Sequence, residues 1–373
     1  MFLALRELKH AKLRYFMIGM ILVLISWLVF LLSGLGNGLS SLSAATFKNM
    51  DADFVVFEDG SRHSMLRSVI SEVLVADLKN LEHVEDAAPM GTRTAVVMKE
   101  NAASDDEKID VSFLGINPGT FLEPKVIEGQ GLSKGKDHEV IANVTLKDQG
   151  VQLGDTLEIE GTTETIKVVG FVENESFNHL PAIFMTLDLW RDIQFAAPGS
   201  DMGIKNPVNA IMLQGENIVP EDVDKSVEGI ETATKKEAIN GLPGYKEENG
   251  TIMMMLAFLM AISAVVITVF FYVITLQKSN QFGVMKAIGA SNSFLGRAVV
   301  SQVFILAVIS IGVGIALTYG TAAVLPEGMP FSLDPKLIVV YAIVLLVVSV
   351  LSSLFSVRKI TKIDPLIAIG RVE

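Results

Sequence analysis

The sequence predicts a membrane protein with four transmembrane helices and one large mixed α+β domain inserted between the first and second helices. Four apolar stretches without Lys, Arg, Asp or Glu support the helices: residues 15–35, 251–277, 298–325 and 337–357. A hydrocarbon core of about 30 Å takes about 20 helical residues, so each stretch can cross it. The polar residues 36–250 separate the first stretch from the other three. The mean hydropathy of +0.47 fits a chain with a minority of its length in lipid.

The first apolar stretch is interpreted as a permanent span rather than as a cleaved signal peptide. Basic residues precede it, and the small residues Ser43, Ala44 and Ala45 follow it, as in a signal peptide. Its length, however, exceeds the apolar core of about 7–15 residues that signal peptides use. The chain holds no cysteine, which excludes disulfides, cysteine ligands to a metal and thiol chemistry.

Charge predicts on which side of the membrane each segment lies. Residues 36–250 contain 37 Asp and Glu against 18 Lys and Arg, a net charge of −19. The segments 1–14, 278–297 and 358–373 together contain 11 basic and 3 acidic residues. By the positive-inside rule, both termini, including an amphipathic N-terminal segment, and the loop after the second span are expected in the cytoplasm. The acidic domain and the short loop 326–336 are then expected outside the cell membrane.

The inserted domain is predicted to mix strands with short helices. Residues 36–47 are rich in Gly, Ser and Ala and can continue the first helix as a stalk. Leu, Val and Ile at helical spacing predict a helix over residues 66–81. The other predicted elements are strands at Asp53–Phe57, Thr94–Lys99, Val111–Leu114 and Glu139–Ala142, a short helix at Val144–Lys147, and a hairpin of Leu157–Glu160 with Thr165–Val172 around Gly161.

No pattern in the inserted domain indicates catalysis or metal binding. Its histidines lack the spacing of metal ligands, and no Ser/His/Asp arrangement stands out; they are His63, His83, His138 and His179. The many acidic residues are typical of a solvated surface. The chain is therefore not expected to be an enzyme by itself, and no metal, intrinsic cofactor or nucleic acid is predicted for it.

Two motifs outside the inserted domain identify a family. Residues 281–291 read QFGVMKAIGAS and predict a short amphipathic helix at the cytoplasmic face, apolar at Phe282, Val284, Met285 and Ile288. The chain ends in DPLIAIG, residues 364–370. These elements resemble the permeases of the MacB/FtsX-like ABC transporter family, in which E-x-G-[IV]-x-[KR]-A-[IV]-G-A follows the second helix and D-P-x-x-A-[IL] the fourth.

The resemblance extends over nearly the whole chain. Residues 139–170 are similar to the extracytoplasmic core domain of that family, with its pattern E-V-x-x-N…G…G-D-x-[IL]…V-V-G. Gln281 stands where the family usually has Glu. Together with FFYVITLQK at residues 270–278, this departure most resembles the haem-exporting branch, the HrtB-type permeases of Gram-positive bacteria.

The resemblance implies the fold, the partners and the mechanism of a type VII ABC transporter. An ATPase on a separate chain, in two copies, would bind the loop after the second span, and the chain's lack of a Walker A motif agrees with ATP hydrolysis in trans. A second copy of this chain would pair with it through the first and second helices, within membrane lipid. ATP-driven closure would pass through the helices to the outer domain, which is called mechanotransmission. The implied coupling residues are Gln281, Phe282, Gly283, Met285, Lys286, Ala287, Ile288 and Gly289.

Haem is the expected cargo, and six residues are candidates for binding it. Met253, Met254 and Met255 begin the second span, and a thioether is both adaptable and a known axial ligand of haem iron. The other candidates are Tyr272, Glu248 and Asn37. The methionines, the tyrosine and the glutamate have ordinary alternatives: methionines can face lipid, a tyrosine can anchor a helix at the interface, and a glutamate can begin a solvated helix.

Since haem is flat and partitions into membranes, we hypothesise a site at the dimer interface, between the outer halves of the first two spans. Gly34, Gly36 and Gly38 can allow close helix approach there, whereas Gly312 and Gly314 are expected to be packing sites in the third span. Two alternatives for the function stay open. One is a permease for another lipophilic compound, a peptide or a lipoprotein. The other is an FtsX-like transmembrane signalling subunit.

Overall fold

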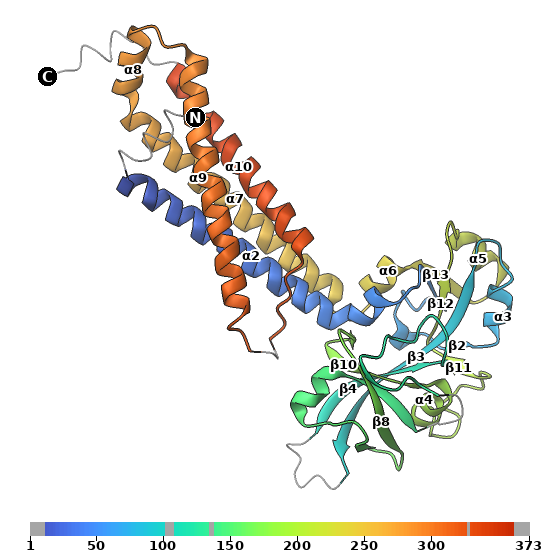
Figure 1. Ribbon diagram of the computed structural model, residues 1–373. Coiled ribbons are helices and arrows are strands. Elements are labelled where there is room, and N and C mark those ends of the chain that lie inside the picture. The colour runs from blue at the N-terminus through green and yellow to red at the C-terminus, as the bar shows by residue number, and fades with distance from the viewer. Residues whose placement is uncertain (1–11, 101–107, 134–137, 327–328, 362–373) are drawn as a thin grey trace. The chain divides into compact units, whose positions relative to one another are not determined.

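The computed structural model describes residues 12–100, 108–133, 138–326 and 329–361. The chain forms two compact units, and the boundaries between them fall inside two long helices. The helical unit comprises Met1–Gly38 and Gly250–Glu373, and the α+β domain comprises Leu39–Asn249 (Figure 1). Among the described residues, four helices are long and apolar enough to cross a membrane. The predicted fold class is therefore confirmed. The terminal motif DPLIAIG and most of the N-terminal segment lie outside the described residues.

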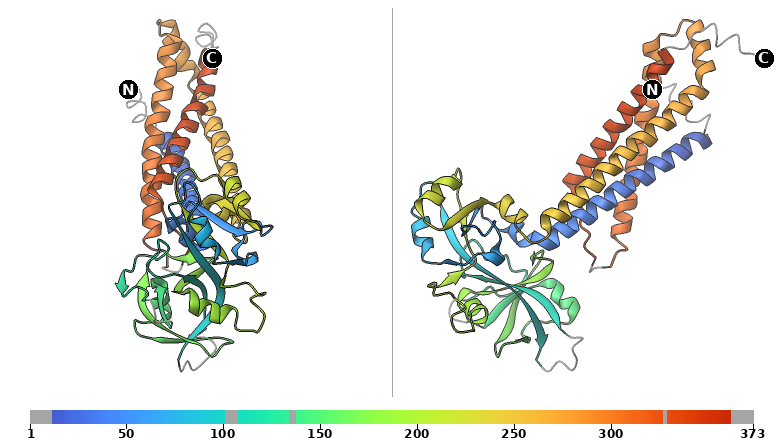
Figure 2. Two further views of the ribbon diagram at one scale, coloured as in Figure 1. Left: turned by 90° about the vertical axis from the view of Figure 1, so that its right-hand side faces the viewer. Right: turned by 180° about the vertical axis from the view of Figure 1, so that it is seen from behind.

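The helical unit consists of four long helices and one short helix. The long ones are α2 (Lys12–Asn49), α7 (Tyr245–Gln277), α9 (Asn292–Ala322) and α10 (Pro335–Thr361). They lie side by side, and the short α8 (Ser279–Ala287) joins α7 to α9 at one end of the bundle (Figure 2). The predicted stalk, residues 36–47, is helical, because α2 continues to Asn49 with one non-helical residue at Ala44 (φ −143°, ψ 18°).

Three of the long helices share a core of apolar side chains. Its members are Tyr15, Ile18 and Leu22 of α2, Ile267, Phe271 and Ile274 of α7, and Val303 and Leu306 of α9. Small residues let α2 and α9 approach closely, since the Ser310 hydroxyl donates to the Gly19 carbonyl at 3.1 Å and a Cβ on Gly314 would meet Ser26 Oγ at 2.2 Å. Gly314 is thus a packing site as predicted. The prediction is wrong for Gly312, where an added Cβ would meet nothing within 4 Å.

The loop between α9 and α10 lies against the far end of the first span. Its Ser332 amide donates to the Gly34 carbonyl at 3.0 Å. A Cβ on Gly34 would lie 2.6 Å from the Phe331 ring, and one on Gly38 would lie 2.2 Å from the Pro330 carbonyl oxygen. The predicted close approach of a helix holds for Gly36, where a Cβ would meet Ile252 of α7 at 2.6 Å. At Gly34 and Gly38, the neighbour is this loop.

The α+β domain is built on a long mixed sheet. Its strands are β1 (Phe54–Glu58), β3 (Asp86–Lys99), β4 (Ile109–Ile116), β5 (Glu128–Gly129), β6 (Glu139–Asn143), β7 (Thr156–Ile159), β8 (Thr165–Val172), β9 (Ser176–Phe177), β10 (Leu180–Thr186), β12 (Ala210–Gln214) and β13 (Ile230–Thr234). A separate pair joins β2 (Ile70–Ser71) to β11 (Pro207–Val208). The helices are α3 (Leu74–Leu78), α4 (Leu187–Gln194), α5 (Pro220–Ser226) and α6 (Lys235–Asn240), with 3₁₀ turns η1 (Met65–Arg67) and η3 (Val144–Gln149).

The sheet runs in the order β13-β1-β12-β3-β4-β10-β6-β8-β5. Because β7 pairs with both β3 and β8, the strands β3, β4, β10, β6, β8 and β7 close into a ring. The pairs β4–β10 and β6–β8 are parallel, and the others in the ring are antiparallel. Closure removes free edges from this part of the sheet.

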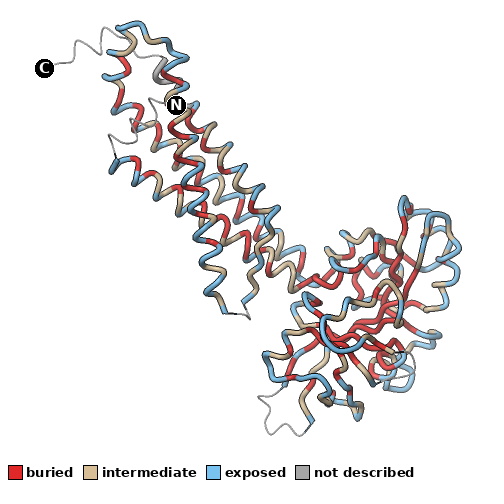
Figure 3. Tube along the Cα trace, viewed as in Figure 1, coloured by how far each residue is buried: buried red, intermediate tan, exposed pale blue. Residues whose placement is uncertain are grey.

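Side chains on the two faces of the sheet form two cores, which follow the period of two that strands impose. On β1, Val56 joins one core, while Val55 and Phe57 join the other. The second core also holds Ala44, Phe47 and Met50 at the end of α2, and Tyr245 at the start of α7. The buried residues run along the centre of the domain in Figure 3. Thus the ends of both long helices are built into one core of this domain.

Most predicted elements of this domain are present, with β3 beginning well before the predicted Thr94. The strands at Glu139 and Val111, the short helix after Asn143 and the hairpin of β7 with β8 are all confirmed. The helix predicted over residues 66–81 is wrong, since that stretch holds η1, β2 and α3. Hydrogen bonds to residues outside this stretch replace those of a helix. The Ser68 hydroxyl accepts from the Glu58 amide at 2.9 Å, and the Ser68 carbonyl accepts from Asn209 Nδ2 at 2.9 Å.

Candidate functional site

The predicted coupling segment forms α8, which is packed onto the start of α9. Phe282 is buried and contacts Leu295 and Val299, with Met285 and Ala290 at the edge of this cluster. After α8, Gly289 has a positive φ of 98°, which is incompatible with continuing the helix. Ser291 then caps α9, because its hydroxyl accepts from the Phe294 amide at 3.2 Å. Through this cluster, α8 is packed against α9.

The four apolar side chains of this segment lie within about 160° of the helix circumference, as an amphipathic helix requires, but only part of this side is covered. Phe282 and Met285 turn inward, whereas Val284 is 48% exposed and Ile288 is 80% exposed. The interior accepts only the side chains that reach α9, so the other two form an exposed apolar surface, called here the coupling face. Of the remaining predicted coupling residues, Gly283 is buried, Lys286 is half-buried, and Gln281, Ala287 and Gly289 are exposed.

The three consecutive methionines are exposed on α7. The exposed fractions are 57% for Met253, 53% for Met254 and 41% for Met255, while Ile252 is buried against Gly36. Successive helical residues are about 100° apart, so Ile252 points into the bundle and the three methionines fan out over the rest of the circumference. They are accessible to lipid, to an apolar ligand or to a second copy of the chain.

Tyr272 and Asn37 do not join the methionines in one site. Tyr272 lies 17 residues after Met255 on the same helix, a rise of about 26 Å. One ligand on one chain cannot contact both. The Asn37 amide donates to the carbonyl and the hydroxyl of Ser332, each at 3.3 Å, so it holds the loop between α9 and α10.

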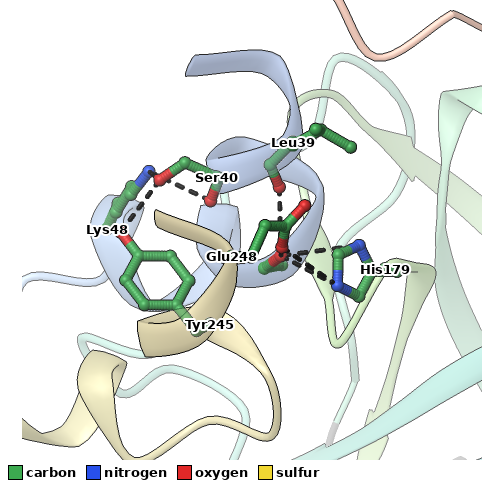
Figure 4. Close-up of polar contacts among 7 residues, drawn as sticks. Leu39, Ser40, Lys48, His179, Tyr245 and Glu248 are labelled. Carbon is green, nitrogen blue, oxygen red and sulfur yellow. Dashed lines mark hydrogen bonds and ion pairs between the residues drawn. The ribbon is translucent and has the colours of Figure 1, made fainter. Parts of the chain in front are cut away.

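Glu248 belongs to a polar cluster in the α+β domain (Figure 4). Its carboxylate accepts from the Ser43 hydroxyl at 3.4 Å and lies 3.5 Å from His179 Nε2, and His179 Nε2 is 3.1 Å from Ser43 Oγ. Nearby, the Ser40 and Tyr245 hydroxyls are 2.8 Å apart. The cluster thus joins the end of α2, the start of α7 and the turn between β9 and β10.

The same turn is bonded to α2 through its backbone. The amides of Asn178 and His179 donate to the carbonyls of Ser43 and Leu42, at 2.9 and 3.1 Å. These carbonyls lie beside the non-helical Ala44, where the break frees them from the helical pattern. Both turn residues have positive φ, as a tight hairpin requires. No site was predicted at His179, and Asn178, a residue type that tolerates positive φ, was the available signal of a turn.

A buried carboxyl group lies at the base of this hairpin. Glu175 accepts from Asn49 Nδ2 at 3.1 Å, and the same amide donates to the Asn174 carbonyl at 2.8 Å. Burial raises the pKa of Glu175 above its ordinary value of 4.5, and the bond from Asn49 opposes that shift. The net direction means that Glu175 is protonated more readily in the folded chain than in the unfolded chain.

We therefore expect Glu175→Gln to raise the apparent melting temperature at neutral pH. A raised folded-state pKa costs stability as the pH rises from 4.5 through that pKa, and this cost is absent below 4.5. Glutamine keeps an oxygen for Asn49 and removes the charge. The gain over wild type, measured by thermal unfolding in detergent, should shrink as the pH falls toward 4.5. Glu173→Gln, at an exposed position, is the control. A gain that is independent of pH, or equal in the control, contradicts the prediction.

Two family models match this chain. Residues 16–229 match the MacB-like periplasmic core domain, and residues 253–365 match the FtsX-like permease C-terminal domain. The first match covers more than half of the chain, so the chain belongs to the MacB-like family. With its four apolar helices and inserted α+β domain, it is an ABC transporter permease of the MacB/FtsX type. Within the described residues, no group of three or more His, Asp or Glu side chains could hold a metal ion.

Relatives align over essentially the full length. A Staphylococcus haemolyticus protein that carries the name hemin transport system permease protein HrtB is 26% identical, over 100% of this chain and 99% of its own. A protein of that name from Staphylococcus epidermidis is also 26% identical, over 99% of each. An ABC transporter permease of Mycobacterium tuberculosis, named as uncharacterized, is 24% identical over 99% of each chain.

Solved structures also resemble part of this chain. The extracellular domain of the noncanonic ABC-type transporter YknZ from Gram-positive bacteria aligns with a TM-score of 0.35 and 14% identity, over 48% of this chain and 98% of that domain. The periplasmic region of MacB from Actinobacillus actinomycetemcomitans aligns with a TM-score of 0.36 and 13% identity, over 51% of this chain and 92% of that region. The family assignment rests on the sequence matches.

Proposed function

We propose that this chain is the permease subunit of an ATP-driven pump that exports haem from the membrane. The observation that supports haem as the cargo is the full-length similarity to proteins named as hemin transport permeases. The exposed thioethers of Met253–Met255 agree with it, because they offer a polarizable, adaptable surface at the membrane-embedded part of α7. A second copy of this chain would face them and enclose the cargo laterally.

The energy for export comes from two copies of a separate ATPase chain. The exposed apolar coupling face, Val284 and Ile288, supports such a partner, since apolar side chains outside the membrane core favour a protein contact. The basic residues of the loop, among them Lys286 and Arg297, support a cytoplasmic location of this face by the positive-inside rule. In this orientation, both termini are cytoplasmic and the α+β domain is outside.

The two long helices would conduct the motion by mechanotransmission. Both α2 and α7 have ends that are built into the core of the α+β domain, through Phe47 and Tyr245. The turn of Asn178 and His179 further fixes the end of α2. A displacement of these helices, driven by ATPase closure, would therefore be passed to the outer domain through their own ends.

Haem retained by the purified complex tests the proposal. Expression of this chain with its ATPase partner, followed by purification from haem-supplied cells, is expected to give a Soret band and ATP hydrolysis that haem stimulates. A strain that lacks the chain is expected to become sensitive to haem. Hydrolysis stimulated by a peptide or a lipoprotein but not by haem would identify a different cargo. A complex that hydrolyses ATP and regulates a cell-wall hydrolase without moving any cargo would support the signalling alternative.

A further inference from the structure

We infer that Tyr15, Lys278 and Gln302 form a clamp through which the movement of α8 reaches the first span. This inference rests on the proposed function, because it assigns a coupling role within an ATP-driven permease. The three residues come from α2, the α7–α8 junction and α9, and they are far apart in the sequence. They are positioning residues: none of them needs to touch cargo or nucleotide.

The clamp is a chain of two buried hydrogen bonds. Lys278 Nζ donates to the Tyr15 hydroxyl at 2.9 Å, and that hydroxyl donates to Gln302 Oε1 at 2.8 Å. The Lys278 ammonium also lies 5.3 Å from the centre of the Tyr15 ring, within reach of a cation–π contact. All three side chains are buried, with exposed fractions of 8% for Lys278, 5% for Gln302 and 4% for Tyr15.

Such a set of polar groups is costly inside a helix bundle, so its role must exceed space filling. Burying an ammonium or an amide side chain away from water is costly unless it is hydrogen-bonded. Around the clamp, the apolar residues Ile18, Phe271 and Ile274 already provide the packing that holds the helices together. Unlike that packing, hydrogen bonds fix distance and direction, so they transmit a displacement that apolar surfaces would allow to slide.

Lys278 lies where α8 joins α7, so movement of α8 can enter the bundle through this residue. It is the residue between α7 and α8, with non-helical backbone angles (φ −94°, ψ 5°), and its carbonyl accepts from the Phe282 amide at 3.0 Å. The apolar packing of Phe282 connects α8 to α9. The hydrogen bond between Lys278 and Tyr15 connects this junction to α2 as well. The other end of α2 is built into the α+β domain.

The clamp predicts that Tyr15→Phe uncouples hydrolysis from transport. Phenylalanine keeps the ring and the packing and removes the hydroxyl that both bonds share. We expect the variant to assemble with the ATPase and to keep basal hydrolysis, while haem-stimulated hydrolysis and export fall about tenfold, as for loss of a typical coupling free energy. Gln302→Leu should have a similar effect, and the double variant should be no worse than either single variant. Tyr319→Phe, at an exposed tyrosine of α9, is the control.

A readout that needs no haem separates this inference from the choice of cargo. Because the chain has no cysteine, spin labels can be placed specifically at Met20 on α2 and Val347 on α10, both about half exposed. ATP should change the distance between these labels in the wild-type complex, and Tyr15→Phe should abolish this change. An unchanged ATP response in Tyr15→Phe overturns the clamp. If the wild-type distance responds to ATP but haem has no effect on hydrolysis, only the proposed cargo is refuted. A wild-type distance that ignores ATP refutes both mechanotransmission and the clamp.

Discussion

Ile288→Asp is expected to release the ATPase subunit from this permease and to stop export. Ile288 is 80% exposed at the end of α8, beside the turn at Gly289, so it is the most accessible apolar side chain of the coupling face. If a partner covers it, aspartate removes apolar contact area and places a charge in a desolvated interface. Truncation of a central interface residue costs about 2 kcal/mol or more, which corresponds to at least about 30-fold weaker binding.

The measurement is copurification of the ATPase with tagged permease, followed by its dissociation constant in detergent. Val324→Asp provides the matched control, since Val324 is 84% exposed just beyond the other end of α9. It should leave binding unchanged. Because Ile288 lies outside the cluster of Phe282 and Leu295, the substitution should not lower the apparent melting temperature of the permease. Normal binding in Ile288→Asp would exclude the coupling face as the ATPase contact.

The helices of this permease could be predicted because the cause of their formation is local. A long run without charge has few alternatives to a membrane helix, since lipid cannot satisfy the backbone otherwise. The extension of α2 to Asn49 is accompanied by contacts with residues distant in the sequence. Ile252 packs against Gly36, and Phe47 stacks on Phe177 at 5.7 Å between ring centres. Composition suggested a stalk, but the break at Ala44 and the contact of the hairpin turn with it could only come from tertiary structure.

In the candidate sites, too, local features could be predicted from the sequence and contacts between distant residues could not. Periodicity correctly predicted a helix after the second span, but it could not tell which apolar side chains would reach α9 and which would remain exposed. The cluster of Ser43, His179 and Glu248 joins residues 136 and 205 positions apart, which no spacing rule connects. Lys278 looked like one of the cytoplasmic basic residues. Its burial follows from the place where α7 ends, which brings it beside Tyr15.

The second large effect is expected at the methionines of α7. We predict that replacing Met253, Met254 and Met255 together with leucine removes the haem that copurifies with the complex and abolishes haem-stimulated hydrolysis. Leucine conserves apolar volume to within a tolerated change, so the fold should persist while the thioethers are lost. Basal hydrolysis and ATPase binding should stay at wild-type levels.

Single substitutions should show which methionine faces the cargo. Since Ile252 points toward Gly36, Met254 lies nearest the opposite side of α7, with Met253 and Met255 on its two flanks. If the cargo lies between paired copies of the chain, one of the three variants should account for most of the loss and should shift the haem absorption spectrum, as replacement of an axial ligand does. Met20→Leu, at a similarly exposed methionine of α2, controls for general loss of thioethers. Wild-type haem stimulation and unaltered spectra in the triple variant would leave these side chains as lipid-facing residues and move the search for the cargo site elsewhere in the bundle.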